Sequence, residues 1–239
     1  MDSKDKQLLE ELKQYDTPTI TNVVAAYPDR PKVCLGLYDS WEGNWYTSSD
    51  LKCIFPEIGR LAGYAVTVTF GLAEEGDTLT YEDMYTALAN SPKPTILCVK
   101  QDFPEKYRNK CGVLGGNMMT AFKSLGCIGV ISDGPGRDID EIRPMGMQYM
   151  ITGASPGHGP FVVKAVGDTV DICDMIVSPG DIVHMDECGA VKFPAEYLER
   201  VAELCRSMSA SDARKQELFK KTCDPHLMYK IKTGEYKGD

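Results

Sequence analysis

The stretch that decides the fold is GGNMMTAFKSLGCIGVISDGPGRD, residues 115–138. Residues 117–125 favour a helix, because apolar side chains recur there at helical spacing. Residues 127–132, CIGVIS, are an apolar run typical of a strand buried on both faces of a parallel sheet. A glycine-rich loop precedes the helix, and a second loop follows the strand. The stretch therefore predicts the middle of a βαβαβ unit.

The flanking sequence extends this unit on both sides. Residues 95–100, TILCVK, and residues 147–151 predict two more strands, and residues 138–145 predict a short helix between strands. Right-handed crossovers would make the three strands parallel. The two loops then leave the same edge of the sheet and face each other, at the place where open α/β sheets bind ligands.

The N-terminal quarter predicts two helices and an excursion. Leucines among charges indicate an amphipathic helix over residues 4–14, and DTPT at residues 16–19 predicts an aspartate cap with proline in the first turn of a second helix. Residues 28–56 are irregular and rich in proline and glycine. We expect this excursion to be packed down by its aromatic side chains, Trp41, Trp45 and Tyr46.

The remaining sequence predicts a second, β-rich layer. Alternating β-branched residues indicate a strand over residues 60–70, and residues 82–89 indicate a helix. Short strands punctuated by glycine and proline are expected at residues 161–166, 170–176, 181–186 and 190–193. A helix over residues 194–221 and a polar tail to Asp239 complete an α/β chain that we expect to form one domain, residues 1–239.

Composition excludes several function classes. The net charge of −9, from 26 basic and 35 acidic residues, disfavours nucleic acid as a partner. No apolar run approaches the length that spans a bilayer, and the N-terminus is too charged for a signal peptide, so we expect a cytoplasmic protein without a membrane partner. The nine cysteines are scattered and form no C-x-x-C pair, which favours reduced thiols.

The first loop, GVLGGN at residues 112–117, has two interpretations. Its paired glycines allow backbone N–H groups to approach a ligand closely, and the helix N-terminus adds positive potential. These features suit a carboxylate or phosphate. A flexible turn at a helix start explains the same residues equally well.

The second loop, SDGPGRD at residues 132–138, also has two interpretations. Arg137 could grip a carboxylate through two parallel hydrogen bonds, and Asp138 could hold a hard divalent cation. Alternatively, Asp138 caps a helix and forms a surface pair with Arg137. Asp133 could orient Arg137, or it could cap the turn.

The longer segment GGNMMTAFKSLGCIGVISDGPGRDIDEIRPMG resembles the signature of the RraA-like family. That family includes 4-hydroxy-4-methyl-2-oxoglutarate aldolases, oxaloacetate decarboxylases and protein regulators of ribonuclease E. Three further segments resemble it: DTPTITN at 16–22, GRLAGYAVTV at 59–68 and SPGDIVHMDECGAVKFP at 178–194. The resemblance implies a swivelling β/β/α fold and self-association as a homotrimer or hexamer, with active sites between subunits.

The resemblance also implies roles for particular residues. Arg137 would bind the substrate carboxylate and Asp138 would hold Mg²⁺ or Mn²⁺. The family's aldolases carry an acidic residue at the position of Gly116, which is a departure here. A further acidic residue comes from the C-terminal helix of an adjacent subunit, and Asp212 is its best match. We expect the substrate to be contacted by Gly115, Gly116, Asn117, Met118, Arg137 and His158.

The resemblance, carried by these residues, implies a metal-dependent lyase that acts on a small 2-oxo acid by aldol cleavage or decarboxylation. Two alternatives stay open because of Gly116. The chain could be a non-catalytic regulator that binds a protein, or an enzyme of the family with a changed reaction. His158 could equally be a solvated loop residue, Met118 could be core packing, and His184 is expected to be structural.

Overall fold

The computed structural model describes residues 3–27 and 33–238. Its main sheet has eight strands in the order β12-β11-β4-β5-β6-β7-β3, and β8 pairs with β4. The central β4, β5, β6 and β7 run parallel, and the other pairings are antiparallel. The strands are β3 (Lys52–Cys53), β4 (Leu61–Gly71), β5 (Thr95–Asp102), β6 (Cys127–Ser132), β7 (Gln148–Ile151), β8 (Val162–Val166), β11 (Ile182–Asp186) and β12 (Gly189–Phe193).

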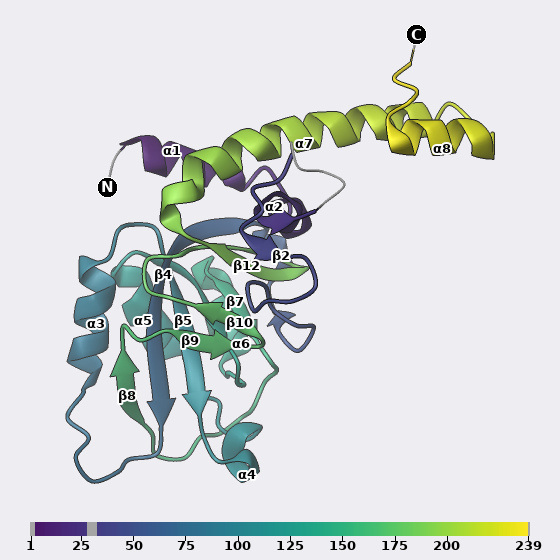
Figure 1. Ribbon diagram of the computed structural model, residues 1–239. Helices are drawn as coiled ribbons and strands as arrows, with labels where there is room; N and C mark the ends of the chain where they lie inside the picture. Colours follow the sequence, from purple (N-terminus) through teal and green to yellow (C-terminus); the bar gives the residue numbers. More distant parts are fainter. Residues whose placement is uncertain (1–2, 28–32, 239) are drawn as a thin grey trace.

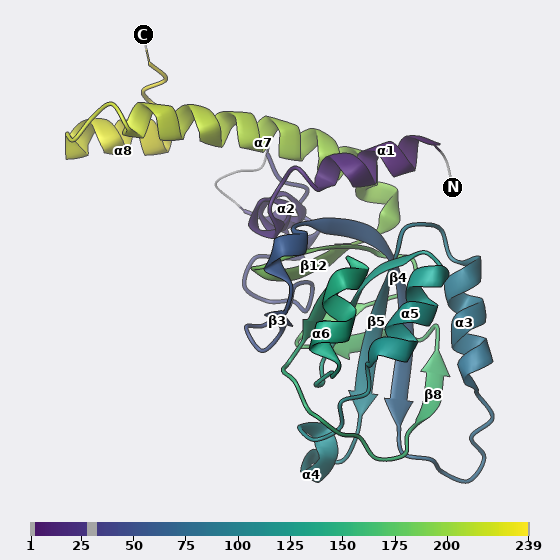
Figure 2. The ribbon, with the colours of Figure 1, turned by 180° about the vertical axis from the view of Figure 1, so that it is seen from behind.

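One face of this sheet is covered by helices (Figure 2). They are α3 (Tyr81–Asn90), α5 (Gly116–Ser124) and α6 (Ile139–Ile142), and the short α4 (Glu105–Arg108) follows β5. Buried Met119 and Phe122 of α5 join the apolar side chains of β5 and β6 in one core. The predicted βαβαβ unit is confirmed, since β5, β6 and β7 are parallel neighbours linked through α5 and α6. Three 3₁₀ turns lie at Pro56–Ile58, Arg143–Met145 and Ala195–Tyr197.

A hairpin of β9 (Val170–Ile172) and β10 (Met175–Val177) packs on the other face, above a second apolar cluster that includes Cys98, Ile131 and Met185. The α/β fold with a β-rich layer is therefore confirmed. The prediction of one strand over 170–176 is wrong. Cys173 and Asp174 both have positive φ, 49° and 71°, and this two-residue turn reverses the chain.

Helices from both ends of the chain lie together beyond one end of the sheet (Figure 1). They are α1 (Ser3–Leu12), α2 (Thr17–Val24), α7 (Leu198–Phe219) and α8 (Pro225–Thr233). The Asp16 side chain caps α2, as predicted, by accepting from Thr19 N at 2.9 Å. The sequence analysis did not predict α8, which occupies half of the expected polar tail. Within the described residues, no helix has both the length and the apolar character needed to cross a bilayer.

Of the three aromatic side chains predicted to pack the excursion after α2, one is fully buried. Between α2 and β3, the described residues of this segment form one short strand pair, in which β2 (Tyr38–Asp39) runs parallel to β1 (Ala25–Ala26). Residues 28–32 lie outside the described part. Trp45 is 1% exposed, stacks on Tyr38 and donates to Asp39 O. Trp41 is 91% exposed, so the prediction that it packs the excursion down is wrong.

A buried histidine fastens α2 to the sheet. His184 on β11 lies with Nε2 3.2 Å from Leu12 O and Nδ1 3.0 Å from Thr17 Oγ1. Because a carbonyl can only accept, Nε2 carries the proton and Nδ1 accepts from the threonine. Asp186 accepts from Thr17 N at 2.7 Å. His184 is therefore structural, as expected.

This arrangement predicts loss of stability in mild acid. Burial lowers the pKa of His184 from 6.5 to about 4. Between these values the unfolded chain binds a proton that the folded chain does not, so stability is lost as pH falls from about 6.5 towards 4. We expect wild type to lose about 2 kcal/mol more than His184→Asn between pH 7 and pH 5. Urea unfolding at both pH values measures this, and parallel losses in the two proteins would contradict it.

Candidate active site at the carboxyl edge of the parallel strands

The two predicted loops do meet, and a third joins them. Isolated parallel bridges pair Leu114 with Gly136 and Gly136 with Ala154, which continues the sheet beyond β6 and β7. Arg137 N donates to Leu114 O at 2.9 Å, and Ser155 N donates to Gly136 O at 2.9 Å. The loops are thus held by backbone hydrogen bonds, and their position relative to each other is fixed.

A buried tyrosine locks the two loops together. The hydroxyl of Tyr149, on β7, donates to Leu114 O at 2.7 Å and accepts from Arg137 N at 3.1 Å. Burial raises the pKa of Tyr149, so the hydroxyl keeps the proton that it donates. No loop motif marks this residue, and the sequence analysis missed it. A tyrosine hydroxyl within the buried strand QYMI, residues 148–151, is the available signal.

Arg137 and Asp138 lie side by side next to the start of α5. Arg137 Nε is 3.3 Å from Asp138 Oδ2, and the same oxygen accepts from Gly116 N at 3.0 Å. Both side chains are about one-third exposed, 33% and 31%. An ion pair this exposed contributes little to stability. The pair and the first N–H groups of α5 instead form one open polar patch.

The backbone of Asp138 argues against the simple cap interpretation. Asp138 stands at the N-cap of α6, but its side chain makes no capping hydrogen bond to that helix. Its φ of 59° is in the left-handed region, which an aspartate tolerates at some cost. This conformation turns the carboxylate to Gly116 on the neighbouring loop.

The paired glycines leave space that charged side chains now occupy. A Cβ on Gly115 would stand 2.7 Å from Asp138 Oδ2 and 3.0 Å from Arg137 Nε. A Cβ on Gly116 would overlap the carboxylate of Glu141, which sequence analysis did not single out. Two acidic side chains from one turn, Asp138 and Glu141, therefore flank the start of α5.

The other predicted site residues have different surroundings. Asn117 is exposed in the first turn of α5, and Met118 packs partly against the main core. His158 is exposed; its Nδ1 is 2.9 Å from Gly159 O, and its ring meets the edge of Phe161. The contacts of His158 thus lie within its own segment and do not join it to Arg137.

Asp133 faces away from the pair. Its carboxylate lies 2.6 Å from Lys100 Nζ and accepts from Gln101 N at 2.7 Å. Burial raises the pKa of Asp133, although the lysine and both hydrogen bonds oppose the shift. These contacts match neither role considered for Asp133, orienting Arg137 or capping the turn; they hold the loop to β5 instead.

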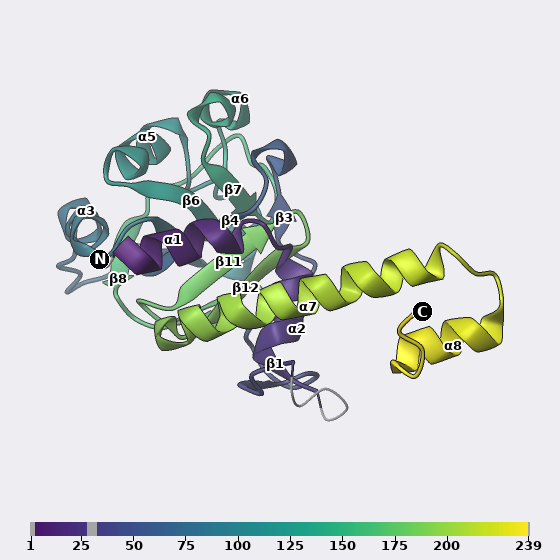
Figure 3. The ribbon, with the colours of Figure 1, turned by 90° about the horizontal axis from the view of Figure 1, so that it is seen from above.

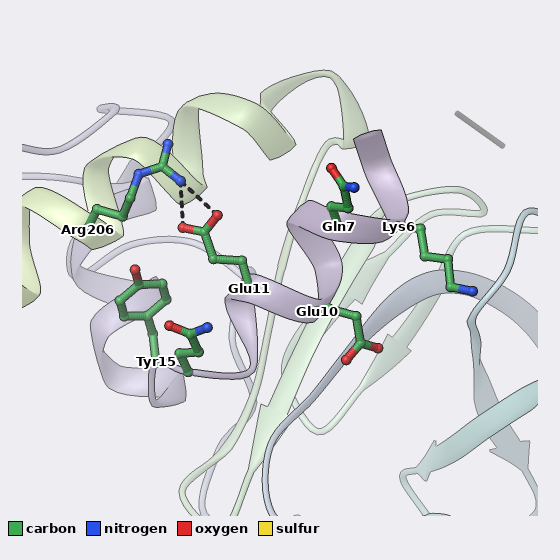
Figure 4. A pocket seen from close by; sticks show the side chains of 7 residues that line it. Lys6, Gln7, Glu10, Glu11, Tyr15 and Arg206 are labelled. Atoms are coloured by element: carbon green, nitrogen blue, oxygen red, sulfur yellow. Dashed lines mark hydrogen bonds and ion pairs between the residues drawn. The ribbon is translucent and has the colours of Figure 1, made fainter. Parts of the chain in front are cut away.

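Asp212 lies far along α7 from this edge. It lines a recess of about 390 Å³ with Asp16 and Arg60, outside the Arg137 loop. A neighbouring recess of about 770 Å³, between α1 and α7, is lined by charged and amide side chains, and Glu11 and Arg206 pair across it (Figure 4). Neither recess includes residues of the two loops.

The carboxylate oxygens near Asp138 are possible ligands for a divalent cation. Within the described residues, no group of three or more His, Cys, Asp or Glu side chains is placed to hold a metal. The carboxylates of Asp138, one-third exposed, and of Glu141, exposed, supply hard oxygen donors beside a helix N-terminus. That set suits Mg²⁺, which is commonly held by one or two carboxylates and keeps several waters.

Comparison with known proteins assigns the sequence that forms this edge of the sheet to a family. The sequence model of the family described as RraA-like, Aldolase/RraA, matches residues 34–192, which include both loops. The chain belongs to the RraA-like family. This family includes both aldolases and decarboxylases and regulators of a ribonuclease, so membership alone does not choose between enzyme and regulator.

Solved structures share the fold of this RraA-like chain. A protein of Pseudomonas syringae pv. tomato is 18% identical, with a TM-score of 0.71 over 94% of this chain and 93% of that one. RraAS2 of Streptomyces coelicolor, described as an unusual member of the RNase ES inhibitor RraA family, is 22% identical, with a TM-score of 0.63 over 90% and 96%.

A curated relative matches part of the sequence. It is an uncharacterized protein of Methanocaldococcus jannaschii, 28% identical over 106 residues, which are 44% of this chain. The match spans about half, 51%, of that relative's length.

Proposed function

We propose that this chain is a lyase that cleaves a C–C bond of a small 2-oxo acid, by aldol cleavage or decarboxylation, with Mg²⁺ or Mn²⁺ as cofactor. The observation that carries the proposal is the Arg137–Asp138 pair beside the N-terminus of α5. Family membership supports it, because the matched segment contains both residues.

Each group has a defined task in this proposal. Arg137 binds the substrate carboxylate with its planar guanidinium, and the N–H groups at the start of α5 add positive potential. Asp138 holds the cation through its carboxylate. When bound, the cation supplies Lewis-acid polarisation of the keto oxygen. Tyr149 keeps both loops in place, so that Arg137 and Asp138 act on the same substrate molecule.

We further propose a homotrimer or hexamer in which α7 reaches a neighbouring subunit. In Figures 1 and 3, the outer part of α7 and α8 project away from the sheet. No residue from 209 to 219 is buried, and Tyr229 on α8 is 61% exposed. A helix that projects in this way can reach the surface of another subunit. Asp212 lies on this part of α7, and in the assembly it would approach the Arg137–Asp138 pair of the next subunit.

The deciding experiment is turnover with defined substrates. The purified protein with Mg²⁺ or Mn²⁺ should release pyruvate from oxaloacetate, from 4-hydroxy-2-oxo acids, or from both. EDTA should abolish release, and a blank with the metal alone corrects for uncatalysed decarboxylation. Absence of turnover on both substrate classes with metal present would refute the lyase.

One observation favours a second function. Gly116 carries no carboxylate, and a protein-binding regulator would not need a complete cation site. A Mn²⁺ titration of the purified chain separates the two proposals. Measurable affinity that depends on Asp138 supports the lyase, whereas no affinity supports the regulator. A turnover screen that finds another C–C cleavage would indicate a changed reaction within the family.

A further inference from the structure

The space beside Gly116 is filled by an acidic group from another helix. A Cβ built on Gly116 would overlap three atoms of Glu141, its Cδ and both carboxylate oxygens. A side chain at position 116 and the observed place of Glu141 therefore exclude each other. The glycine is what lets a carboxylate from α6 reach the start of α5.

Asp138 and Glu141 approach Gly116 from the same turn. Glu141 N donates to Asp138 O at 3.1 Å, which sets the two residues on the first turn of α6. Asp138 Oδ2 accepts from Gly116 N, while the Glu141 carboxylate lies where the Gly116 side chain would be. The carboxylates of Asp138 and Glu141 thus both lie next to Gly116, one at its N–H group and the other at the place of a Cβ.

The charged side chains beside Gly116 do not balance one another. Arg137 pairs with Asp138, whereas Glu141 has no ion pair in the part of the chain that the structure describes. Two carboxylates and one guanidinium leave one net negative charge. The N-terminus of α5 offsets only part of it. A divalent cation together with a substrate carboxylate would bring the group close to neutrality.

We propose that Glu141 is the second acidic residue of the site, supplied from α6 in place of a side chain at position 116. The inference rests on the proposed function of Arg137 and Asp138. Glu141 acts as a positioning residue: its carboxylate accepts hydrogen bonds from the waters that the cation keeps, and so fixes the cation against Asp138. The departure at Gly116 is then a relocation of the acidic group and not its loss.

The test is a Mn²⁺ titration of the full-length protein, followed by electron paramagnetic resonance. Glu141→Gln should raise the Kd for Mn²⁺ by about 10-fold or more, in the range found for groups that support a metal ligand. Glu141→Asp should retain most of the affinity. Asp140→Asn, an exposed neighbour outside the site, is the matched control and should bind as wild type does.

A swap of positions gives a second, stricter readout. Gly116→Asp combined with Glu141→Ala puts a carboxylate back beside Asp138 from α5 and removes the overlap. This double variant should bind Mn²⁺ within about threefold of wild type, whereas Glu141→Ala alone should bind it about 10-fold more weakly. A purely structural role of Glu141 would not produce this rescue.

The outcomes separate this inference from the proposed function. If wild type binds Mn²⁺ and Asp138→Asn abolishes binding, but Glu141→Gln leaves Kd unchanged, the inference is wrong and the lyase stands. If wild type binds no Mn²⁺ and turns over no 2-oxo acid, both are wrong. Melting temperatures of all variants are measured alongside, and a Glu141→Gln protein that is folded but weak in Mn²⁺ binding supports the inference.

Discussion

Replacing Asp138 by asparagine should lower kcat/KM for pyruvate release by about 1000-fold, which corresponds to about 4 kcal/mol of transition-state stabilisation. The carboxylate is the protein ligand that we assign to the cation. An amide oxygen is neutral and binds a hard cation much more weakly. The substituted enzyme should therefore fail to hold the cofactor at concentrations that saturate wild type.

Asparagine is chosen because it leaves the fold unchanged. Its side-chain oxygen can still accept from Gly116 N, and asparagine tolerates the left-handed backbone that Asp138 adopts. We expect the melting temperature to stay close to that of wild type, while Mn²⁺ affinity is lost. Asp140→Asn, two residues along and exposed, is the matched control and should keep its activity. Full activity of Asp138→Asn would refute the assignment.

The position of the site could be predicted from sequence because it follows from topology. Two buried runs, each followed by a glycine-containing loop and a helix, must place both loops on one edge if the strands are parallel. The structure confirms this through the bridge between Leu114 and Gly136. The role of Tyr149 was not predictable in this way, because it depends on the hydroxyl lying within hydrogen-bond distance of both loops.

Other errors had local causes. The nine-residue helix α8 was missed, although Asp224 before Pro225 is a cap signal and Gly234 a stop signal. Trp41 and Trp45 are both aromatic residues of one irregular segment. Only the fold decides that Trp45 is buried against Tyr38 and Trp41 is not.

Glu141 shows where sequence reasoning ends. It stands 25 residues after Gly116, with no motif that joins the two. Their contact depends on the left-handed turn at Asp138 and on the helix that follows it. In the arrangement that we propose, the acidic group absent at position 116 comes from another helix, and Glu141 can be identified as its source only once the backbone is known.

Replacing Gly136 by alanine should destabilise the fold by about 4 kcal/mol, because this glycine is required for space. A Cβ there would overlap the Tyr149 hydroxyl and stand 2.6 Å from its Cζ. Its φ is not positive, so backbone strain does not contribute. Tyr149 would have to move, which would break its hydrogen bonds to Leu114 O and Arg137 N. Urea unfolding measures the loss.

The cause can be isolated with a double-mutant cycle. Tyr149→Phe alone should cost about 0.5–1.5 kcal/mol, because the hydrogen bonds of the hydroxyl are lost while Arg137 N and Leu114 O still bond to each other. In that background Gly136→Ala should cost at least about 1 kcal/mol less than in wild type, since the overlapping oxygen is gone. Gly153→Ala is the matched control in the adjoining loop: its Cβ would meet nothing within 4 Å, and it should be close to neutral. Additive costs of the two substitutions would show that the hydroxyl of Tyr149 is not what excludes a side chain at position 136.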